Sequence, residues 1–144
     1  MKSVLFLCTG NYYRSRFAEE LFNHHAALVG LNWTARSAAL AIERGVVNVG
    51  PLSPHTLQAL ANRGVRALRA AHYPRQCVLD DLKTADLIVA MDEAEHRPLM
   101  LERFRVWSDR ATFWHVEDVH AWSPDRAIAS IEREVMVLIS ALRG

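Results

Sequence analysis

A cysteine and an arginine separated by five residues form the strongest chemical signal in the sequence. They lie between an apolar run that ends at Leu7 and a helical pattern near Phe17, in the stretch Cys8-Thr9-Gly10-Asn11-Tyr12-Tyr13-Arg14-Ser15. The backbone N–H groups of such a loop, together with the N-terminus of the following helix, suit an anion. The positive electrostatic potential of these groups also favours the thiolate form of Cys8. The planar guanidinium of Arg14 can donate two hydrogen bonds to two phosphate oxygens. We therefore predict a cysteine nucleophile inside a phosphate-binding loop.

The elements around this loop predict an α/β fold. Residues 2–7 form an unbroken apolar run, which is typical of a strand that is buried on both faces of a parallel sheet. Further strands are expected near 33–38, 86–91 and 112–116, and helices near 15–29, 53–64, 78–84, 93–104 and 123–144. Phe17, Leu21, Leu28 and Val29 are expected to line the inner side of the first helix. The inner side of the second is expected to consist of Leu57, Leu60 and Ala61. Pro98 is expected to kink or split the fourth helix.

The loop leaves the carboxyl end of the first strand, where ligands bind in open parallel sheets. We expect one domain over residues 1–144, because this length suffices for a hydrophobic core and no linker or repeat interrupts it. Composition narrows the function further. With 17 Lys+Arg against 16 Asp+Glu, the net charge of +1 argues against nucleic acid as a partner. No apolar run has the length of a membrane span.

The two cysteines, Cys8 and Cys77, are too few for a disulfide framework, so a reducing, cytoplasmic location is expected. The absence of CxxC and HExxH patterns gives no support for a metal, and we expect no cofactor. Cys77 is expected to pack as a small hydrophobic residue.

The combination of motifs resembles the low-molecular-weight protein tyrosine phosphatase family. The signature is the run from Val4 to Ser15, and further similarities follow in order along nearly the whole chain: Arg36-Ser37-Ala38, Asn48-Val49-Gly50, His72-Tyr73-Pro74-Arg75-Gln76 and Asp86 to Asp92. The resemblance implies a three-layer α/β domain whose four-stranded parallel sheet has the order 2-1-3-4, flanked by helices. It also implies hydrolysis of phosphate monoesters, with protein phosphotyrosine or a small aryl phosphate as substrate, by a monomer or weak dimer.

The resemblance also implies a role for each matching residue. Cys8 would attack phosphorus, Arg14 would clamp the phosphate oxygens, and Ser15 would donate a hydrogen bond to the Cys8 sulfur. Asp118 takes the position of the general acid, which typically contributes roughly 10²–10⁴-fold to the rate. The phosphate would be bound by the loop residues Thr9, Gly10, Asn11, Tyr12, Tyr13, Arg14 and Ser15. Ser37 and His72 would support the loop through Asn11.

The sequence departs from the family at several of these positions. Val119 stands where a proline is expected after the acid, which predicts a less rigid acid loop. The aromatic residues that usually follow are absent, so Trp122 or His120 would supply the pocket wall. Tyr13 replaces a second cysteine, which excludes a disulfide within the loop. Arg16 and Val47 replace a proline and a tryptophan. These changes bear on substrate preference more than on phosphate binding.

Several alternatives remain at this point. Asp109, Glu117 and Asp125 are other acids near Asp118. Tyr12 and Tyr13 either line the mouth of the site or pack against neighbouring loops. His55, His96 and His115 are expected at the surface or at helix caps. The rival functions are a thiol redox enzyme similar to arsenate reductase, which would need a relay of further cysteines, and a phosphate-binding module without turnover.

Overall fold

The computed structural model describes residues 1–118 and 122–144. The elements follow in the order β1 (Lys2–Cys8), α1 (Arg14–Leu28), β2 (Trp33–Ala39), η1 (Ile42–Gly45), α2 (Pro54–Asn62), α3 (Leu79–Thr84), β3 (Leu87–Ala90), α4 (Glu93–Arg103), η2 (Arg105–Arg110), β4 (Ala111–Phe113) and α5 (Pro124–Arg143). Strands and helices alternate along most of the chain, as predicted. Among the described residues, no helix is long and apolar enough to cross a membrane.

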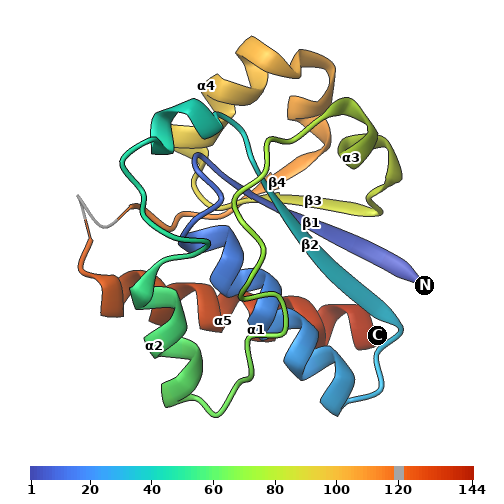
Figure 1. Cartoon of the computed structure of the whole chain (residues 1–144). Coiled ribbons are helices and arrows are strands. Elements are labelled where there is room, and N and C mark those ends of the chain that lie inside the picture. Colours follow the sequence, from blue (N-terminus) through green and yellow to red (C-terminus); the bar gives the residue numbers. More distant parts are fainter. Residues whose placement is uncertain (119–121) are drawn as a thin grey trace.

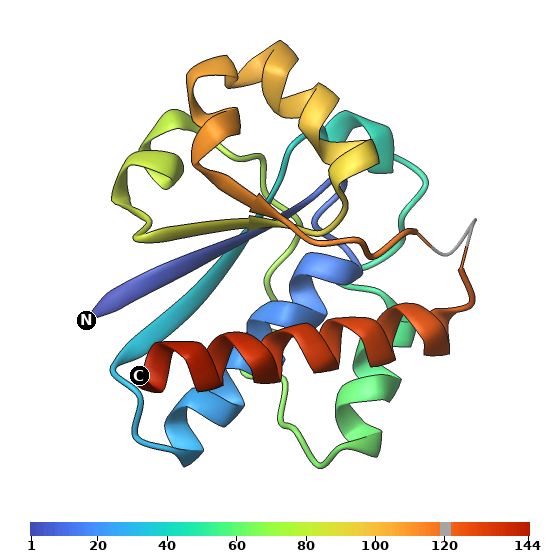
Figure 2. The same cartoon turned by 180° about the vertical axis from the view of Figure 1, so that it is seen from behind.

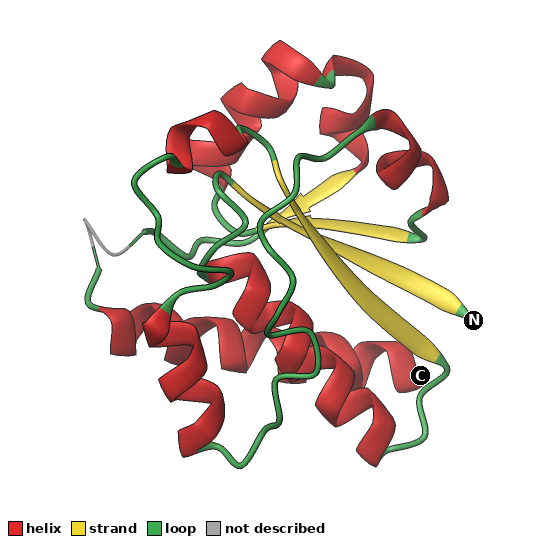
Figure 3. Ribbon diagram, in the orientation of Figure 1, coloured by secondary structure: helices red, strands yellow, loops and turns green. Residues whose placement is uncertain are grey.

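The four strands form one parallel sheet in the order β2-β1-β3-β4 (Figures 1 and 3), which confirms the predicted topology. The central strand β1 pairs with β2 on one side and β3 on the other, so that Phe6 lies opposite both Ser37 and Val89. Each connection between these parallel neighbours requires a crossover, which the helices supply.

Helices cover both faces of the sheet. Helices α1, α2 and α5 lie on one face, and α3 and α4 lie on the other, as Figures 1 and 2 show. Successive β1 side chains point to opposite faces. Accordingly, Val4 and Phe6 belong to the core cluster under α1 and α5, whereas Leu5 and Leu7 belong to the cluster under α3 and α4. The continuous apolar run of β1 thus reflects burial on both sides.

Two Ser-Pro pairs start helices as their sequence suggests. The Ser53 and Ser123 hydroxyls accept hydrogen bonds from the His55 and Arg126 N–H groups, and each proline occupies the first helical turn. In contrast, Pro98 does not split α4, which runs unbroken from Glu93 to Arg103.

Four apolar residues that were expected to face the core lie at the surface. Leu28 and Val29 are 68% and 39% exposed, because they are the last residue and the C-cap of α1. Leu57 and Ala61 are also exposed. Leu60 is buried as predicted, and Thr56 and Ala59 complete the buried side of α2.

Hydrogen bonds beyond the strand ends bring distant segments beside the Cys8 loop. Met91 N–H donates to the Leu7 carbonyl, and Val116 N–H donates to the Met91 carbonyl. The segment after β4 therefore continues along the carboxyl edge of the sheet. This pairing carries Asp118, which is 110 positions after Cys8 in the sequence, to the end of β1.

Candidate active site

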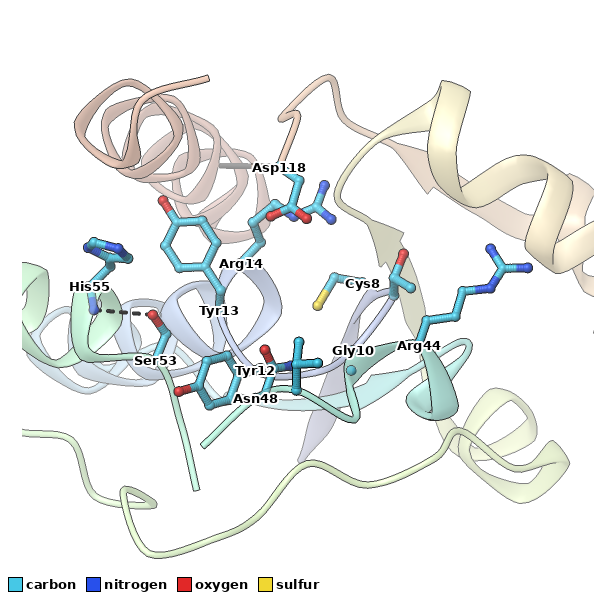
Figure 4. A pocket seen from close by; sticks show the side chains of 13 residues that line it. Cys8, Gly10, Tyr12, Tyr13, Arg14, Arg44, Asn48, Ser53, His55 and Asp118 are labelled. Carbon is cyan, nitrogen blue, oxygen red and sulfur yellow. Dashed lines mark hydrogen bonds between the residues drawn. The ribbon is translucent and has the colours of Figure 1, made fainter. Parts of the chain in front are cut away.

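A cavity of about 250 Å³ opens at the carboxyl end of β1 (Figure 4). Its lining comes from the Cys8 loop, η1 and the loop after it, the start of α2, and the segment after β4. The residues are Cys8, Thr9, Gly10, Tyr12, Tyr13, Arg14, Arg44, Gly45, Val47, Asn48, Ser53, His55 and Asp118. The structure therefore gathers into one cavity the cysteine, the arginine and the aspartate singled out from the sequence.

Four carbonyl groups of the Cys8 loop accept hydrogen bonds from neighbouring segments. The Cys8 and Thr9 carbonyls accept hydrogen bonds from Leu40 N–H and Ala41 N–H, the Tyr12 carbonyl accepts one from Ser53 N–H, and the Tyr13 carbonyl accepts one from Thr56 Oγ1. In a planar trans peptide the N–H points opposite to the carbonyl. The N–H groups that follow these four carbonyls consequently point away from the segments that bind the carbonyls, which leaves them available for an anion cradle.

A chain of hydrogen bonds supports the cysteine from below. Cys8 Sγ lies 2.9 Å from Ser15 Oγ, and Asn11 Nδ2 donates to both Ser15 Oγ (2.9 Å) and Ser37 Oγ (3.0 Å). Asn11 has a φ of 52°, a left-handed conformation that asparagine tolerates better than most residues. The Ser37 hydroxyl in turn donates to the buried carboxylate of Glu19. The expected contact between Asn11 and Ser37 is therefore present.

Arg14 is buried and is held from two sides. Its NH1 donates to the Val116 carbonyl at 2.8 Å, and its NH2 pairs with Glu95 Oε2 at 2.7 Å. Burial alone would lower the pKa of Arg14, but the bond with Glu95 and the charges of Cys8 and Asp118 raise it. A guanidinium carries five N–H donors, and these two bonds engage one donor on each of its terminal nitrogens.

Glu95 is a site residue that the sequence interpretation missed. It accepts hydrogen bonds from Arg14 and from the Thr9 hydroxyl, and His96 Nε2 lies 3.1 Å from the same Oε2 atom. Partial burial opposes its charge, but the bonds from His96 and Arg14 hold the pKa of Glu95 well below its usual range. Glu95 is therefore a carboxylate that orients the phosphate-binding arginine.

His96 was expected at the surface or at a helix cap; it is not at the surface, but it does bind the N-cap residue of α4, Asp92. Its side chain is fully buried, and its Nδ1 accepts a hydrogen bond from Asp92 N–H at 3.0 Å. The proton of a neutral ring is thus assigned to Nε2, which faces Thr9 and Glu95. Burial is possible because both ring nitrogens have partners.

Asp118 lies on the rim of the pocket. Figure 4 shows its carboxylate above Cys8 and beside Arg14. Asp118 is the one carboxylate that lines this cavity among residues 1–118 and 122–144, since Asp109 and Glu117 are exposed elsewhere and Asp125 borders a neighbouring cavity. Trp122 N–H donates to the Asp118 carbonyl, and the Trp122 ring packs on the core cluster. Trp122 does not line the pocket, and His120 is outside the described residues.

The two tyrosines of the loop have separate contacts. Tyr12 lines the pocket and donates its hydroxyl proton to the Val49 carbonyl at 2.6 Å. Tyr13 also lines the pocket but is 7% exposed, and its hydroxyl donates to the Pro124 carbonyl at 3.1 Å. Both alternatives predicted for the tyrosines are therefore correct. Each ring borders the cavity, and each hydroxyl binds a neighbouring segment.

His72 does not support the loop through its side chain, so this prediction is corrected. The His72 side chain is exposed, and Asn11 Oδ1 accepts instead from Arg75 N–H at 3.2 Å. The reason is Arg16, whose buried guanidinium binds the carbonyls of His72, Arg69 and Pro51. Arg16 therefore occupies the space behind the loop and turns the His72 backbone, rather than its ring, toward α1.

Cys77 is buried in the core cluster under α3 and α4, as its interpretation as a packing residue predicts. Burial, followed by the charge of Asp81, raises the pKa of the Cys77 thiol to about 12. Neither cysteine forms a disulfide. Across the part of the chain that the structure describes, no group of three His, Cys, Asp or Glu residues is arranged to hold a metal ion.

Comparisons with known proteins agree with this geometry. The family model described as "Low molecular weight phosphotyrosine protein phosphatase" matches residues 3–143. The chain is 32% identical over 107 residues to a protein-arginine-phosphatase of Bacillus subtilis (74% of this chain, 66% of the relative). It is 32% identical over 130 residues to a low molecular weight phosphotyrosine protein phosphatase of Sus scrofa (88% of this chain, 76% of the relative).

A solved structure is similar over almost its whole length. The low molecular weight protein tyrosine phosphatase from T. tengcongensis is 26% identical, with a TM-score of 0.77, and the match covers 99% of this chain and 97% of that one. The chain therefore belongs to the low molecular weight phosphotyrosine protein phosphatase family, whose members are phosphoric-monoester hydrolases.

Proposed function

We propose that this protein hydrolyses protein phosphotyrosine through a phosphocysteine intermediate. The observation that carries the proposal is the convergence of Cys8, Arg14 and Asp118 on one cavity from segments far apart in the sequence. The nucleophile, the cation for the transferred group and a proton donor are the parts that this chemistry needs.

In the first step, Cys8 Sγ attacks phosphorus while the bond to the leaving oxygen breaks. Asp118 gives its proton to that oxygen, so the alcohol or phenol leaves neutral. Arg14 and the loop N–H groups hold the equatorial oxygens of the phosphoryl group and stabilise the charge that is spread over them. Because Glu95 and the Val116 carbonyl fix Arg14, this charge stabilisation is set before the substrate binds.

In the second step, Asp118 takes a proton from water, and the resulting oxygen nucleophile attacks phosphorus. The P–S bond breaks, and inorganic phosphate and the Cys8 thiolate are released. The Ser15 hydroxyl lies close enough to Cys8 Sγ to donate a hydrogen bond to the departing sulfur. Asn11 holds that hydroxyl in place, and Ser37 holds Asn11.

The cavity walls favour an aromatic leaving group. Tyr12 and Val47 offer apolar surface beside the Cys8 loop. Arg44 lines the cavity together with Arg14, and their positive charges disfavour the guanidinium of a substrate there. Phosphoarginine is nevertheless the alternative substrate to test, because the relative from Bacillus subtilis is a protein-arginine-phosphatase.

The two rival functions have less support. A thiol redox enzyme needs a cysteine that can reach the nucleophile, whereas Cys77 is buried in the other core cluster. A binding module without turnover would leave Asp118 away from the cavity, and Asp118 lines it. We also propose a cytoplasmic location and a monomer or weak dimer, the former because both cysteines are free thiols.

The test measures p-nitrophenol release from p-nitrophenyl phosphate by the wild type, Cys8→Ser and Asp118→Asn. We expect Cys8→Ser to lose turnover. Asp118→Asn should lose roughly 10²–10⁴-fold on phenyl phosphate, a second substrate with a poor leaving group, and less on p-nitrophenyl phosphate. Cys77→Ala is the matched cysteine control and should keep the activity. Phosphotyrosine and phosphoarginine peptides then rank the two substrate classes.

Other results would point elsewhere. Phosphate binding by the wild type without turnover would indicate the binding module. Reduction of arsenate without ester hydrolysis would exclude the phosphatase.

A further inference from the structure

Two consecutive residues of the phosphate loop hold the two ends of the segment that carries Asp118. Arg14 NH1 donates to the Val116 carbonyl, two residues before Asp118. The Tyr13 hydroxyl donates to the carbonyl of Pro124, the first residue of α5. Val116 and Pro124, on either side of Asp118 in the sequence, are thereby each bound to the loop that contains the nucleophile. Trp122 N–H, two residues before Pro124, donates to the Asp118 carbonyl and so links Asp118 to the start of α5.

The hydroxyl of Tyr13 is placed to act only as an anchor. Its side chain is nearly buried, and its ring lies edge-on to the His55 ring, with centroids 6.1 Å apart. Burial, and then the negative charge of Asp118, raises the pKa of the phenol to about 12, against the opposing charge of Arg14. The phenol therefore keeps its proton at neutral pH and can donate it to the Pro124 carbonyl.

The backbone of Tyr13 belongs to the phosphate loop as well. Its carbonyl accepts hydrogen bonds from Phe17 N–H and Thr56 Oγ1, which fix it at the start of α1. Figure 4 shows the ring on the same side of the cavity as Asp118, next to α5. A rigid side chain with two χ angles thus connects the fixed loop to the end of the acid segment.

We propose that Tyr13 is a positioning residue that sets the placement of the Asp118 carboxylate relative to Cys8. This inference rests on the proposed phosphatase function and adds a role that is separate from binding the phosphate. The hydroxyl acts through Asp118, so its loss impairs protonation of the leaving group and leaves the phosphate cradle intact. A misplacement of about 1 Å can cost on the order of 10²-fold in rate.

The test compares two esters whose leaving groups need the acid to different degrees. Phenyl phosphate releases a weakly acidic phenol, which depends on protonation, whereas p-nitrophenol leaves readily as its anion. In Tyr13→Phe, which keeps the ring, we expect kcat/KM for phenyl phosphate to fall about tenfold. For p-nitrophenyl phosphate it should change by about twofold or less, and inhibition by inorganic phosphate should also stay within about twofold.

A double-mutant cycle separates positioning from a general loss of structure. If the hydroxyl acts through the carboxylate, Tyr13→Phe added to Asp118→Asn should have no further effect on phenyl phosphate turnover. Tyr73→Phe is the matched control, since it removes the same hydroxyl from an exposed tyrosine outside this cavity. Thermal unfolding of each variant monitors the fold.

Three results would overturn the inference while leaving the phosphatase standing: an equal loss on both esters, a weakened phosphate inhibition, or losses that add in the double mutant. An unchanged Tyr13→Phe enzyme would overturn it too. In contrast, a wild type without any Cys8-dependent hydrolysis of either ester would overturn the proposed function itself.

Discussion

At the scale of single residues, the site depends on how one guanidinium is oriented. Arg14 has the flexibility of a long side chain, yet it is buried and bound to a carboxylate and a carbonyl. Glu95 supplies the carboxylate and also binds the Thr9 hydroxyl. A cation fixed before its ligand arrives loses less entropy on binding.

Glu95→Ala should therefore reduce catalysis without removing any group that reacts. We expect kcat/KM for p-nitrophenyl phosphate to fall about tenfold or more, because Arg14 loses its fixed orientation. Glu95→Gln keeps an oxygen that can accept from Arg14, so it should recover most of the loss. Steady-state kinetics of the three proteins at one pH measure the effect.

Glu93→Ala is the control for this prediction. Glu93 lies two residues earlier in the same helix and pairs with Arg97 at the surface, so its removal should change kcat/KM by less than about twofold. Equal kinetics for Glu95→Ala and the wild type would show that Val116 alone orients Arg14.

Site residues could be predicted from the sequence where they belong to one local motif. They were harder to predict where their partners are distant in the sequence. Cys8 and Arg14 follow from one loop, and Asp118 follows from the family resemblance. Glu95 and Arg16 were not predicted, because charged residues on a helix usually face solvent and their partners lie on other segments. Arg16 binds carbonyls that are 35, 53 and 56 residues away, which no local pattern encodes.

At the scale of elements, the short helix α3 stabilises the segment that supports Asn11. Asp81 in its first turn accepts two hydrogen bonds from Arg75, at 3.0 and 2.8 Å, and a third from Val78 N–H. Arg75 N–H in turn donates to Asn11 Oδ1. The capping of α3 is thus connected to the floor of the phosphate loop.

Asp81→Asn should destabilise the fold at neutral pH by about 1–2 kcal/mol, since it weakens charge-assisted hydrogen bonds to a half-exposed arginine. Burial opposes the charge of Asp81, but the bonds from Arg75 and Val78 outweigh it and hold its pKa below the ordinary value. The stabilisation is therefore present above the unfolded-state pKa, about 3.9, and is lost as pH falls through the lower folded value.

Urea unfolding of both proteins at neutral and acidic pH measures this difference. Asp80→Asn is the matched control, because Asp80 is exposed in the same turn and its change should cost no more than about 0.5 kcal/mol. If the difference in unfolding free energy between the wild type and Asp81→Asn grew toward low pH, it would contradict this prediction.

At the scale of the whole molecule, the sheet separates two hydrophobic clusters of different extent. The cluster under α1 and α5 includes the buried face of the longest helix, α5, with Ile128, Ile131 and Val135. The Ile and Val spacing of this helix predicted that face correctly. The exposed positions of Leu28 and Leu57 were not predictable, because periodicity defines a helix face but not which neighbour covers it.

Ile131→Ala should lower the free energy of unfolding by about 2–5 kcal/mol, because Ile131 is fully buried in this cluster and the change leaves a cavity. Val137→Ala, on the exposed side of the same helix, should cost about 0.5 kcal/mol or less. Urea unfolding followed by tryptophan fluorescence compares the two. Similar losses in both variants would mean that α5 contributes through helix propensity rather than through packing.

The separation of the two cysteines has a practical consequence for anyone who handles the protein. Cys8 borders the cavity, whereas Cys77 is sealed in the opposite cluster with a thiol that holds its proton. Of the two thiols, only Cys8 borders this cavity, so an alkylating reagent that enters the cavity of the folded protein should modify the sulfur on which the proposed chemistry depends. The amount of reagent incorporated per chain thus measures the fraction of intact sites in a preparation. Unfolding the same sample exposes Cys77, whose alkylation then serves as an internal standard for the total amount of protein.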